Sequence, residues 1–195
     1  MAKLYFSYAT MNAGKSTLLL QASYNYRERG MRTAILIAAF DDRAGQGRIS
    51  SRIGLSADAI AFDRADDLYR HIEELNGEGD DRIACVFVDE AQFLTEEQVW
   101  QLARVADRMH IPVMAYGLRT DFQGKLFPGS RALLALADEL REVRTICHCG
   151  RKATMVVRVG ADGAVMREGA QVEVGGNDRY VSLCRRHWED KMSGA

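Results

Sequence analysis

The sequence predicts an α/β fold in which helices cover a parallel β-sheet, followed by a small C-terminal domain. Two observations support this prediction. Over residues 1–146, short runs rich in β-branched and aromatic residues alternate with helical patterns, as in a sheet built from strands and crossover helices. From Cys147 the composition shifts to short β-like pieces separated by glycine-containing turns. We therefore expect two domains, residues 1–146 and residues 147–195.

The strands of the first domain are predicted from short apolar runs. Residues 83–88 are apolar throughout, as expected of a strand that is buried on both faces. The other predicted strands are residues 4–8, 33–37 and 113–116, with 143–146 as a candidate fifth.

Helical patterns lie between these strands. Gly30 is expected to end the first helix, and Thr95 with Gln98 forms a capping-box signal at the start of the third. The predicted helices are residues 16–29, 65–75, 95–109 and 133–140.

Two segments do not fit this alternation. Residues 41–56 are rich in glycine, serine and arginine without a clear period, which indicates a long loop acting as a lid or lacking order. In the C-terminal domain, β-like pieces at residues 154–159 and 171–174 are joined through Ala161-Asp162-Gly163 and followed by Gly175-Gly176-Asn177.

Composition places the chain among ordinary soluble proteins. Its 195 residues are 47% hydrophobic and 27% charged, and the net charge is −1, so nothing in the bulk charge calls for nucleic acid or an anionic membrane. The sequence has no apolar run of membrane-spanning length and does not begin like a signal peptide. We expect a cytoplasmic protein whose four cysteines stay reduced.

A phosphate-binding loop is predicted between the first strand and the first helix. The segment Ala9-Thr10-Met11-Asn12-Ala13-Gly14-Lys15-Ser16 has the strand–loop–helix context of a Walker A motif, although the motif asks for glycine where this chain has Ala9. Gly14 lets backbone N–H groups approach a phosphate at a helix N-terminus. Lys15 is expected to reach the β- and γ-phosphates, and the Ser16 hydroxyl to bind Mg²⁺. The alternative is a chance Gly-Lys-Ser at a helix start.

Two adjacent carboxylates end the apolar strand. In P-loop proteins a carboxylate at this position holds Mg²⁺, the role predicted for Asp89. Glu90 points in another direction and is the candidate general base for an attacking hydroxyl. The alternative is an acidic turn after a strand. Cys85, within the strand, is interpreted as a core residue.

Cysteine and histidine pairs in the C-terminal domain predict a structural zinc site. Cys147 and Cys149 are followed much later by Cys184 and His187, a closed Cys₃His set for a reducing compartment. The first pair is spaced C-x-C, not the commoner C-x-x-C. His148 lies between two ligands that would strain to share the metal with it, so we interpret it as a non-ligand.

Taken together, these motifs resemble the tetrameric, zinc-containing class of thymidine kinases, which includes bacterial enzymes and the human cytosolic enzyme. The resemblance covers essentially the whole chain. Its further marks are Ser23-Tyr24-Asn25-Tyr26, Arg29-Gly30-Met31-Arg32-Thr33, Asp41-Asp42-Arg43, Asp89-Glu90-Ala91-Gln92-Phe93, Tyr116-Gly117-Leu118-Arg119-Thr120-Asp121-Phe122 and Gly175-Gly176-Asn177-Asp178-Arg179-Tyr180.

The resemblance implies a RecA-like P-loop core and a zinc domain with a lasso loop that covers the nucleoside. Asp41 and Arg43 match a polar pair near the active site. The implied ATP- or phosphate-binding residues are Ala9, Thr10, Met11, Asn12, Ala13, Gly14, Lys15, Ser16, Asp89 and Gln92. The implied nucleoside-binding residues are Met11, Phe93, Leu118, Phe122, Phe127, Val172, Val174, Gly175, Gly176 and Tyr180. Taken singly, Met11, Phe93, Leu118, Phe122, Phe127 and Tyr180 are each better explained as core residues at strand ends.

The implied activity is transfer of the γ-phosphate of ATP to the 5′-hydroxyl of thymidine, and of deoxyuridine, in deoxynucleotide salvage for DNA synthesis. Glu90 takes the hydroxyl proton, Lys15 and Mg²⁺ neutralise charge, and the loop at 41–56 excludes water. The resemblance also implies a homotetramer and feedback binding of thymidine triphosphate, with no nucleic acid or membrane partner.

Two alternatives belong to other classes. One is a P-loop motor ATPase, in which Glu90 would activate water. The other is a nucleic-acid-binding zinc module, for which Arg151, Lys152, Arg185 and Arg186 would provide a basic face. Those charges are better explained as solvated side chains or subunit contacts.

Overall fold

The predicted parallel sheet is present and forms the centre of the molecule. The computed structural model describes residues 1–39, 47–172 and 179–194. Six strands follow the order β5-β2-β6-β7-β1-β8, and every pairing between neighbours is parallel. The strands are β1 (Leu4–Ala9), β2 (Arg32–Ala38), β5 (Ile60–Phe62), β6 (Ile83–Val88), β7 (Val113–Leu118) and β8 (Glu139–Glu142). The predicted α/β class is therefore confirmed.

Strand order brings the two predicted motifs to one edge of this sheet. β7 lies between β1, which leads into the phosphate loop, and β6, which ends at the acidic pair. Ala9 is in register with Leu118, and Val88 with Ala115. Because the carboxyl ends of parallel strands meet at the same edge, both motifs open onto one crevice.

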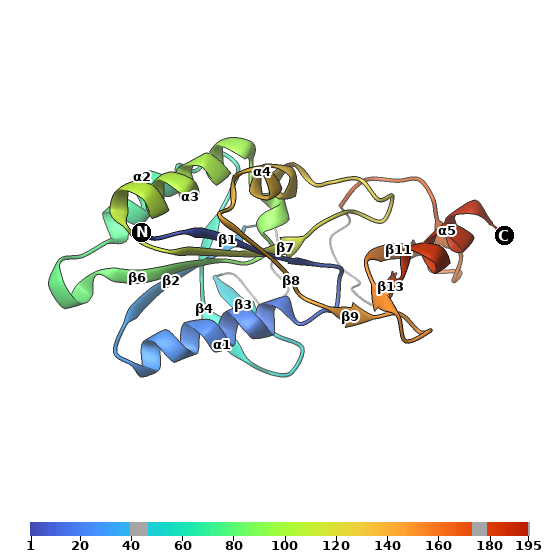
Figure 1. The fold of residues 1–195 in the computed structure, drawn as a ribbon, viewed down its shortest axis with the longest axis horizontal. Coiled ribbons are helices and arrows are strands. Elements are labelled where there is room, and N and C mark those ends of the chain that lie inside the picture. The colour runs from blue at the N-terminus through green and yellow to red at the C-terminus, as the bar shows by residue number, and fades with distance from the viewer. Residues whose placement is uncertain (40–46, 173–178, 195) are drawn as a thin grey trace.

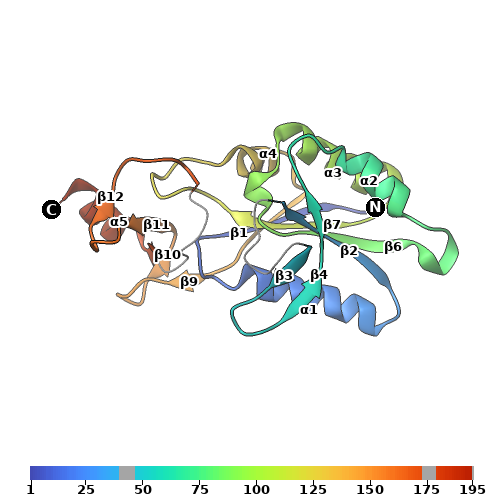
Figure 2. The same ribbon diagram turned by 180° about the vertical axis from the view of Figure 1, so that it is seen from behind.

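Helices cover both faces of the sheet. On one face lie α2 (Leu68–Leu75), α3 (Glu96–Met109) and α4 (Pro128–Leu136), and on the other lies α1 (Lys15–Glu28) with the hairpin of β3 (Arg48–Ser50) and β4 (Ser56–Asp58) (Figures 1 and 2). Each face has its own apolar core, one including Leu102 and the other including Leu19 and Phe87. Short 3₁₀ turns, η1 (Gly79–Asp81) and η2 (Ala91–Phe93), flank β6.

Local signals account for most helix boundaries. Thr95 and Gln98 make both hydrogen bonds of the predicted capping box at the start of α3. The first helix ends at Glu28, with Arg29 as its C-cap and Gly30 following in the left-handed region. The second was predicted to start at residue 65, but α2 starts at Leu68 because the Asp67 carboxylate accepts the N–H of Arg70.

The prediction of a helix at 133–140 is wrong in position. Pro128, whose fixed φ suits a first turn, begins α4, and the chain becomes extended at Ala137. Residues 139–142 then form β8, where the Asp138 carboxylate accepts the N–H of Leu4 beside the edge of β1. The strand predicted at 143–146 is reduced to β9 (Thr145–Ile146), because Val143 continues from β8 with its N–H bonded to Tyr8.

The segment predicted as one long loop contains a hairpin. β3 and β4 pair antiparallel, and Ile49 is buried between the hairpin and α1. The remaining part of the prediction, residues 41–46, which includes Asp41 and Arg43, lies outside the described residues. β5 was not predicted, since only three residues join the sheet there.

The C-terminal part is a small unit of short strands at the end of the molecule opposite the N-terminus (Figure 1). β11 (Met155–Val159) lies between β12 (Val165–Met166) and β13 (Tyr180–Leu183), and β9 pairs with β10 (Lys152–Ala153). The predicted turn at 161–163 connects β11 to β12, and α5 (Arg185–Ser193) follows β13. Gln171 and Val172 are not in a strand, and Val174, Gly175 and Gly176 lie outside the described residues.

Candidate active site

The predicted phosphate loop joins β1 to α1 with two residues in the left-handed region. Asn12 has φ of 64° and Gly14 has φ of 82°, and Gly14 is the N-cap of α1. A Cβ on Gly14 would meet no atom within 4 Å, so its backbone conformation is what favours glycine here. Ala9 lies within β1 and is not among the residues of positive φ, which explains why alanine is accommodated there.

Lys15 is held across this loop. Its side chain is buried, and Nζ donates a hydrogen bond to the Thr10 carbonyl at 3.0 Å. The ammonium therefore lies where the loop N–H groups and the start of α1 already favour negative charge.

Ser16 and Asp89 connect the loop to the end of β6. The Ser16 hydroxyl donates to Oδ2 of Asp89 at 2.8 Å, while Oδ1 is buried and has no hydrogen-bond partner among the described residues. Burial, reinforced by the charge of Glu90, raises the pKa of Asp89 to about 7 against the opposing hydrogen bond from Ser16. A buried carboxylate with an unpaired oxygen beside a hydroxyl fits Mg²⁺, which prefers such oxygen ligands.

Glu90 is held by backbone and side-chain contacts at the start of η2. Its φ of 50° places it in the left-handed region, so its side chain leaves the strand in a different direction from that of Asp89. Gln92 is fully buried, donates from Nε2 to Oε2 of Glu90 at 2.5 Å and accepts the N–H of Leu118 at 2.9 Å. The glutamine thus connects Glu90 to the end of β7.

These groups border one cavity of about 430 Å³. Most of the predicted site residues line it together: Met11, Asn12, Ala13, Gly14, Lys15, Ser16, Asp89, Glu90, Gln92, Phe93, Leu118, Phe122, Phe127, Val172 and Tyr180. Ala9 and Thr10 do not line the cavity. Among its apolar walls, Phe93 and Phe127 meet edge to face with ring centroids 5.9 Å apart.

Several lining residues were not singled out from the sequence. They are Asp121, Val156 of β11, and Ile49, Ser50, Ser51, Arg52 and Ile53, which were predicted only as part of the lid at 41–56 and belong to the β3–β4 hairpin. Gln171 also lines the cavity, in the segment 171–174 that the family resemblance places at the nucleobase. Asp121 directly precedes Phe122 in the motif at residues 116–122, which indicated that Asp121 lies near the cavity. The glycine-rich composition of residues 41–56 was the signal for the hairpin, whereas β11 carries none, because only the folded chain brings Val156 to the cavity.

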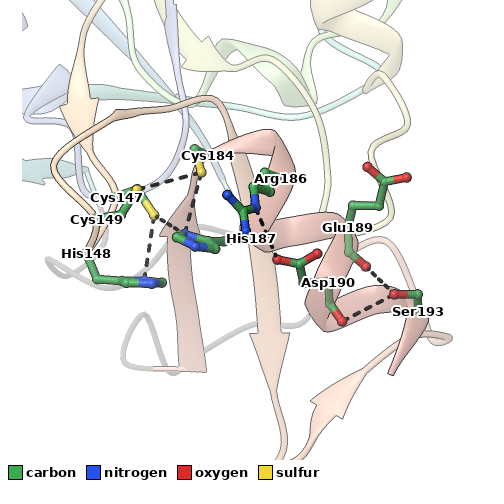
Figure 3. A network of polar contacts seen from close by, with 9 residues as sticks. All are labelled: Cys147, His148, Cys149, Cys184, Arg186, His187, Glu189, Asp190 and Ser193. Atoms are coloured by element: carbon green, nitrogen blue, oxygen red, sulfur yellow. Dashed lines mark hydrogen bonds and ion pairs between the residues drawn. The ribbon is translucent and has the colours of Figure 1, made fainter. Parts of the chain in front are cut away.

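The four predicted zinc ligands lie together in the C-terminal unit (Figure 3). The Sγ atoms of Cys147, Cys149 and Cys184 and a ring nitrogen of His187 all lie within 4.8 Å of one another. The pKa of Cys147 is lowered to about 6: burial opposes ionisation, and hydrogen bonds from Cys149, Cys184 and His187 outweigh it. This donor set fits a tetrahedral zinc, whose ligands lie at about 2.0–2.3 Å.

His148 is beside the cluster without belonging to it. Its Nδ1 lies 3.6 Å from Sγ of Cys147, and its ring stacks on that of His187 with centroids 4.3 Å apart. Its interpretation as a non-ligand stays a prediction.

The fold and this site define a class: a P-loop α/β protein with its nucleotide loop and acidic strand end on one cavity. A family model described as thymidine kinase matches residues 2–188. Similar proteins named thymidine kinase come from Rhizobium meliloti (80% identical, 98% of each chain), Rhizobium etli (72%, 100% of this chain and 97% of the relative) and Photobacterium profundum (57%, 98% and 99%). The chain belongs to the thymidine kinase family, and it is an ATP-dependent nucleoside kinase.

Proposed function

We propose that this chain transfers the γ-phosphate of ATP to the 5′-hydroxyl of thymidine, and of deoxyuridine, for deoxynucleotide salvage and DNA synthesis. Family membership supports the activity. The observation that carries it in the structure is the single cavity that unites Lys15, the Ser16–Asp89 pair and Glu90 with the aromatic wall of Phe93, Phe122 and Phe127. This supports a site in which the phosphate-binding groups and an apolar surface for the nucleobase both border Glu90, the candidate general base.

The residues divide the reaction between them. The loop N–H groups and Lys15 orient the triphosphate and stabilise the charge that develops on the transferring group. Ser16 and Asp89 would hold Mg²⁺, which would neutralise part of the negative charge of the triphosphate. The oxygen of the 5′-hydroxyl attacks the γ-phosphorus, and Glu90 accepts the proton of that hydroxyl. The bond between the γ-phosphorus and the bridging oxygen breaks, and that oxygen leaves with ADP.

Recognition of the nucleobase is assigned to the apolar part of the cavity wall. Met11, Leu118, Phe127 and Tyr180 supply apolar surface there. We propose that the backbone of the segment after Val172, which includes Val174, Gly175 and Gly176 outside the described residues, bonds the base edge. A nucleobase that left such backbone groups unpaired in the complex would be rejected, at about 1–3 kcal/mol for each group.

Zinc is assigned a structural role in this scheme. The cluster of Cys147, Cys149, Cys184 and His187 joins the start of the C-terminal unit to α5. A zinc ion held by these four residues would have a full set of protein ligands and no open position for substrate. A division into residues 1–146 and 147–195 follows from this role.

The family resemblance further supports a cytoplasmic homotetramer that binds thymidine triphosphate as a feedback inhibitor. Among the described residues no helix has the length and apolar character needed to cross a membrane. The rival motor ATPase is disfavoured by the apolar, aromatic wall beside Glu90, which suits a base better than it suits attacking water.

A phosphoryl-transfer screen with γ-labelled ATP and each natural deoxynucleoside tests this function. Label should appear in thymidine and deoxyuridine monophosphates, and hydrolysis without nucleoside should be slow. Equal hydrolysis with and without thymidine would contradict the proposal, and stimulation by DNA would favour the motor.

A further inference from the structure

Arg158 is a buried cation that the proposed reaction does not use. It lies in β11, the central strand of the C-terminal sheet, and its relative exposure is 0%. Arginine side chains are almost never fully buried unless they are paired, because removing their charge from water is unfavourable. The contacts of the buried guanidinium therefore indicate which parts of the structure Arg158 holds in place.

The contacts of Arg158 lead to the wall of the active-site cavity. Its guanidinium carbon lies 4.0 Å from the ring centroid of Phe122, a residue that follows β7 in the core. Phe122 lines the cavity, whereas Arg158 does not. The guanidinium therefore packs on the aromatic ring without itself touching the space proposed for the nucleoside.

The neighbours of Arg158 on its sheet also belong to that wall. Val156 is two residues earlier, so the two side chains share one face of β11. Tyr180 of β13 is directly opposite Arg158 in register and shares the same face. Both Val156 and Tyr180 line the cavity.

Arg158 also holds the chain that approaches the cavity from β12. Its Nη1 donates to the Ala170 carbonyl at 2.9 Å. Gly169 has φ of 140°, and a Cβ added there would collide with Nη2 of Arg158. Glycine thus lets this segment pass close against the guanidinium, and Gln171 then donates to Oδ2 of Asp121 at 2.9 Å, next to Phe122.

We propose that Arg158 is a positioning residue for nucleoside binding. It holds in place two parts of the cavity wall, the Phe122 ring and the segment at 169–172. This inference rests on the proposed function, because it assigns Phe122 and Val172 to the nucleoside. Arg158 acts through these residues and does not contact the substrates. Its loss should therefore weaken thymidine binding and leave ATP binding largely unchanged.

The test compares Arg158→Met and Arg158→Lys with the native protein in steady-state thymidine phosphorylation. Methionine removes the charge and the planar fork, so KM for thymidine should rise about tenfold with less than a twofold change in KM for ATP. Lysine keeps the charge but offers neither the planar stack nor the fork, and should raise KM for thymidine by about threefold or more. Arg167→Met is the matched control: it removes an exposed charge from the same unit and should leave both KM values unchanged.

A double-mutant cycle separates positioning from general stability. If Arg158 acts through Phe122, Arg158→Met should raise KM for thymidine much less in a Phe122→Leu background than in the native chain. Thermal melting and zinc content identify a variant that fails to fold, and Arg158→Lys then decides the question. A folded variant at position 158 with native KM for thymidine, or fully additive effects with Phe122→Leu, would overturn the inference. If the native protein itself does not phosphorylate thymidine, the proposed function fails instead.

Discussion

Gln92 and Glu90 are joined by a 2.5 Å hydrogen bond in which the amide of one donates to the carboxylate of the other. The amide oxygen of Gln92 accepts the N–H of Leu118, so this side chain ties η2 to the end of β7. Gly117 makes room for it, because a Cβ there would lie 2.9 Å from both the backbone N and Oε1 of Gln92. The geometry suits a residue that orients Glu90, the carboxylate that we propose as the general base.

Gln92→Met tests this orientation. The thioether has similar size but cannot donate to Glu90 or accept from Leu118, so we expect kcat to fall about tenfold to a hundredfold. KM for ATP should stay within about twofold. If KM for ATP rises while kcat is retained, Gln92 instead contacts the nucleotide, the role that the family resemblance implies.

Glu90→Gln tests the proposed general base directly. The amide keeps the shape of the side chain but cannot accept the proton, so turnover should fall by about two to four orders of magnitude. Nucleotide affinity, measured by equilibrium binding, should be nearly native. Turnover above a tenth of the native value would remove Glu90 from this role.

Ser16→Ala tests the proposed Mg²⁺ site. The change removes a hydroxyl ligand and the 2.8 Å hydrogen bond to Asp89, so the Mg²⁺ concentration for half-maximal activity should rise about tenfold. Saturating Mg²⁺ should recover much of the turnover. An unchanged Mg²⁺ dependence would place the metal elsewhere.

Removing a zinc ligand should unfold the C-terminal unit selectively. The native protein should contain one zinc per chain, and Cys184→Ser should lose both the zinc and thymidine binding. The reason is that the free energy of zinc binding contributes to the free energy of folding of this unit. His148→Ala is the matched control and should keep its zinc, because the predicted ligand set does not include His148, which stacks on the ring of His187. Metal-free native protein prepared without chelators, or full zinc in Cys184→Ser, would contradict the assignment.

Much of the core could be predicted because its signals are local. The apolar run of β6, the capping box at Thr95 and the glycine-lysine-serine loop each specify their own segment. The failures lie where tertiary pairing decides: residues 139 and 140 were predicted to end a helix, but they belong to β8, which completes the sheet beside β1. Likewise the sequence places Arg158 in a strand, but only the fold puts its guanidinium on Phe122.

Trp188 gives the last prediction, because its indole holds two walls of the cavity together. Nε1 donates to the carbonyls of both Phe122 in the core and Val156 in β11, each at 3.1 Å. Trp188→Phe keeps an aromatic ring on α5 but leaves both carbonyls without this donor, which should destabilise the protein by about 1–3 kcal/mol.

The melting temperature of Trp188→Phe should therefore fall by roughly 2–4 °C for each kcal/mol lost, in a chain of this size. Because Phe122 and Val156 line the cavity, in the part that we propose binds the nucleoside, KM for thymidine should rise about threefold to tenfold while KM for ATP changes little. Trp100→Phe is a matched control, since Trp100 is 45% exposed on α3 and should tolerate the change. It also leaves Trp188 as the sole tryptophan, so thymidine, and not ATP alone, should alter the fluorescence of that variant. Equal effects of the two substitutions on KM for thymidine would show that Trp188 does not align the cavity walls.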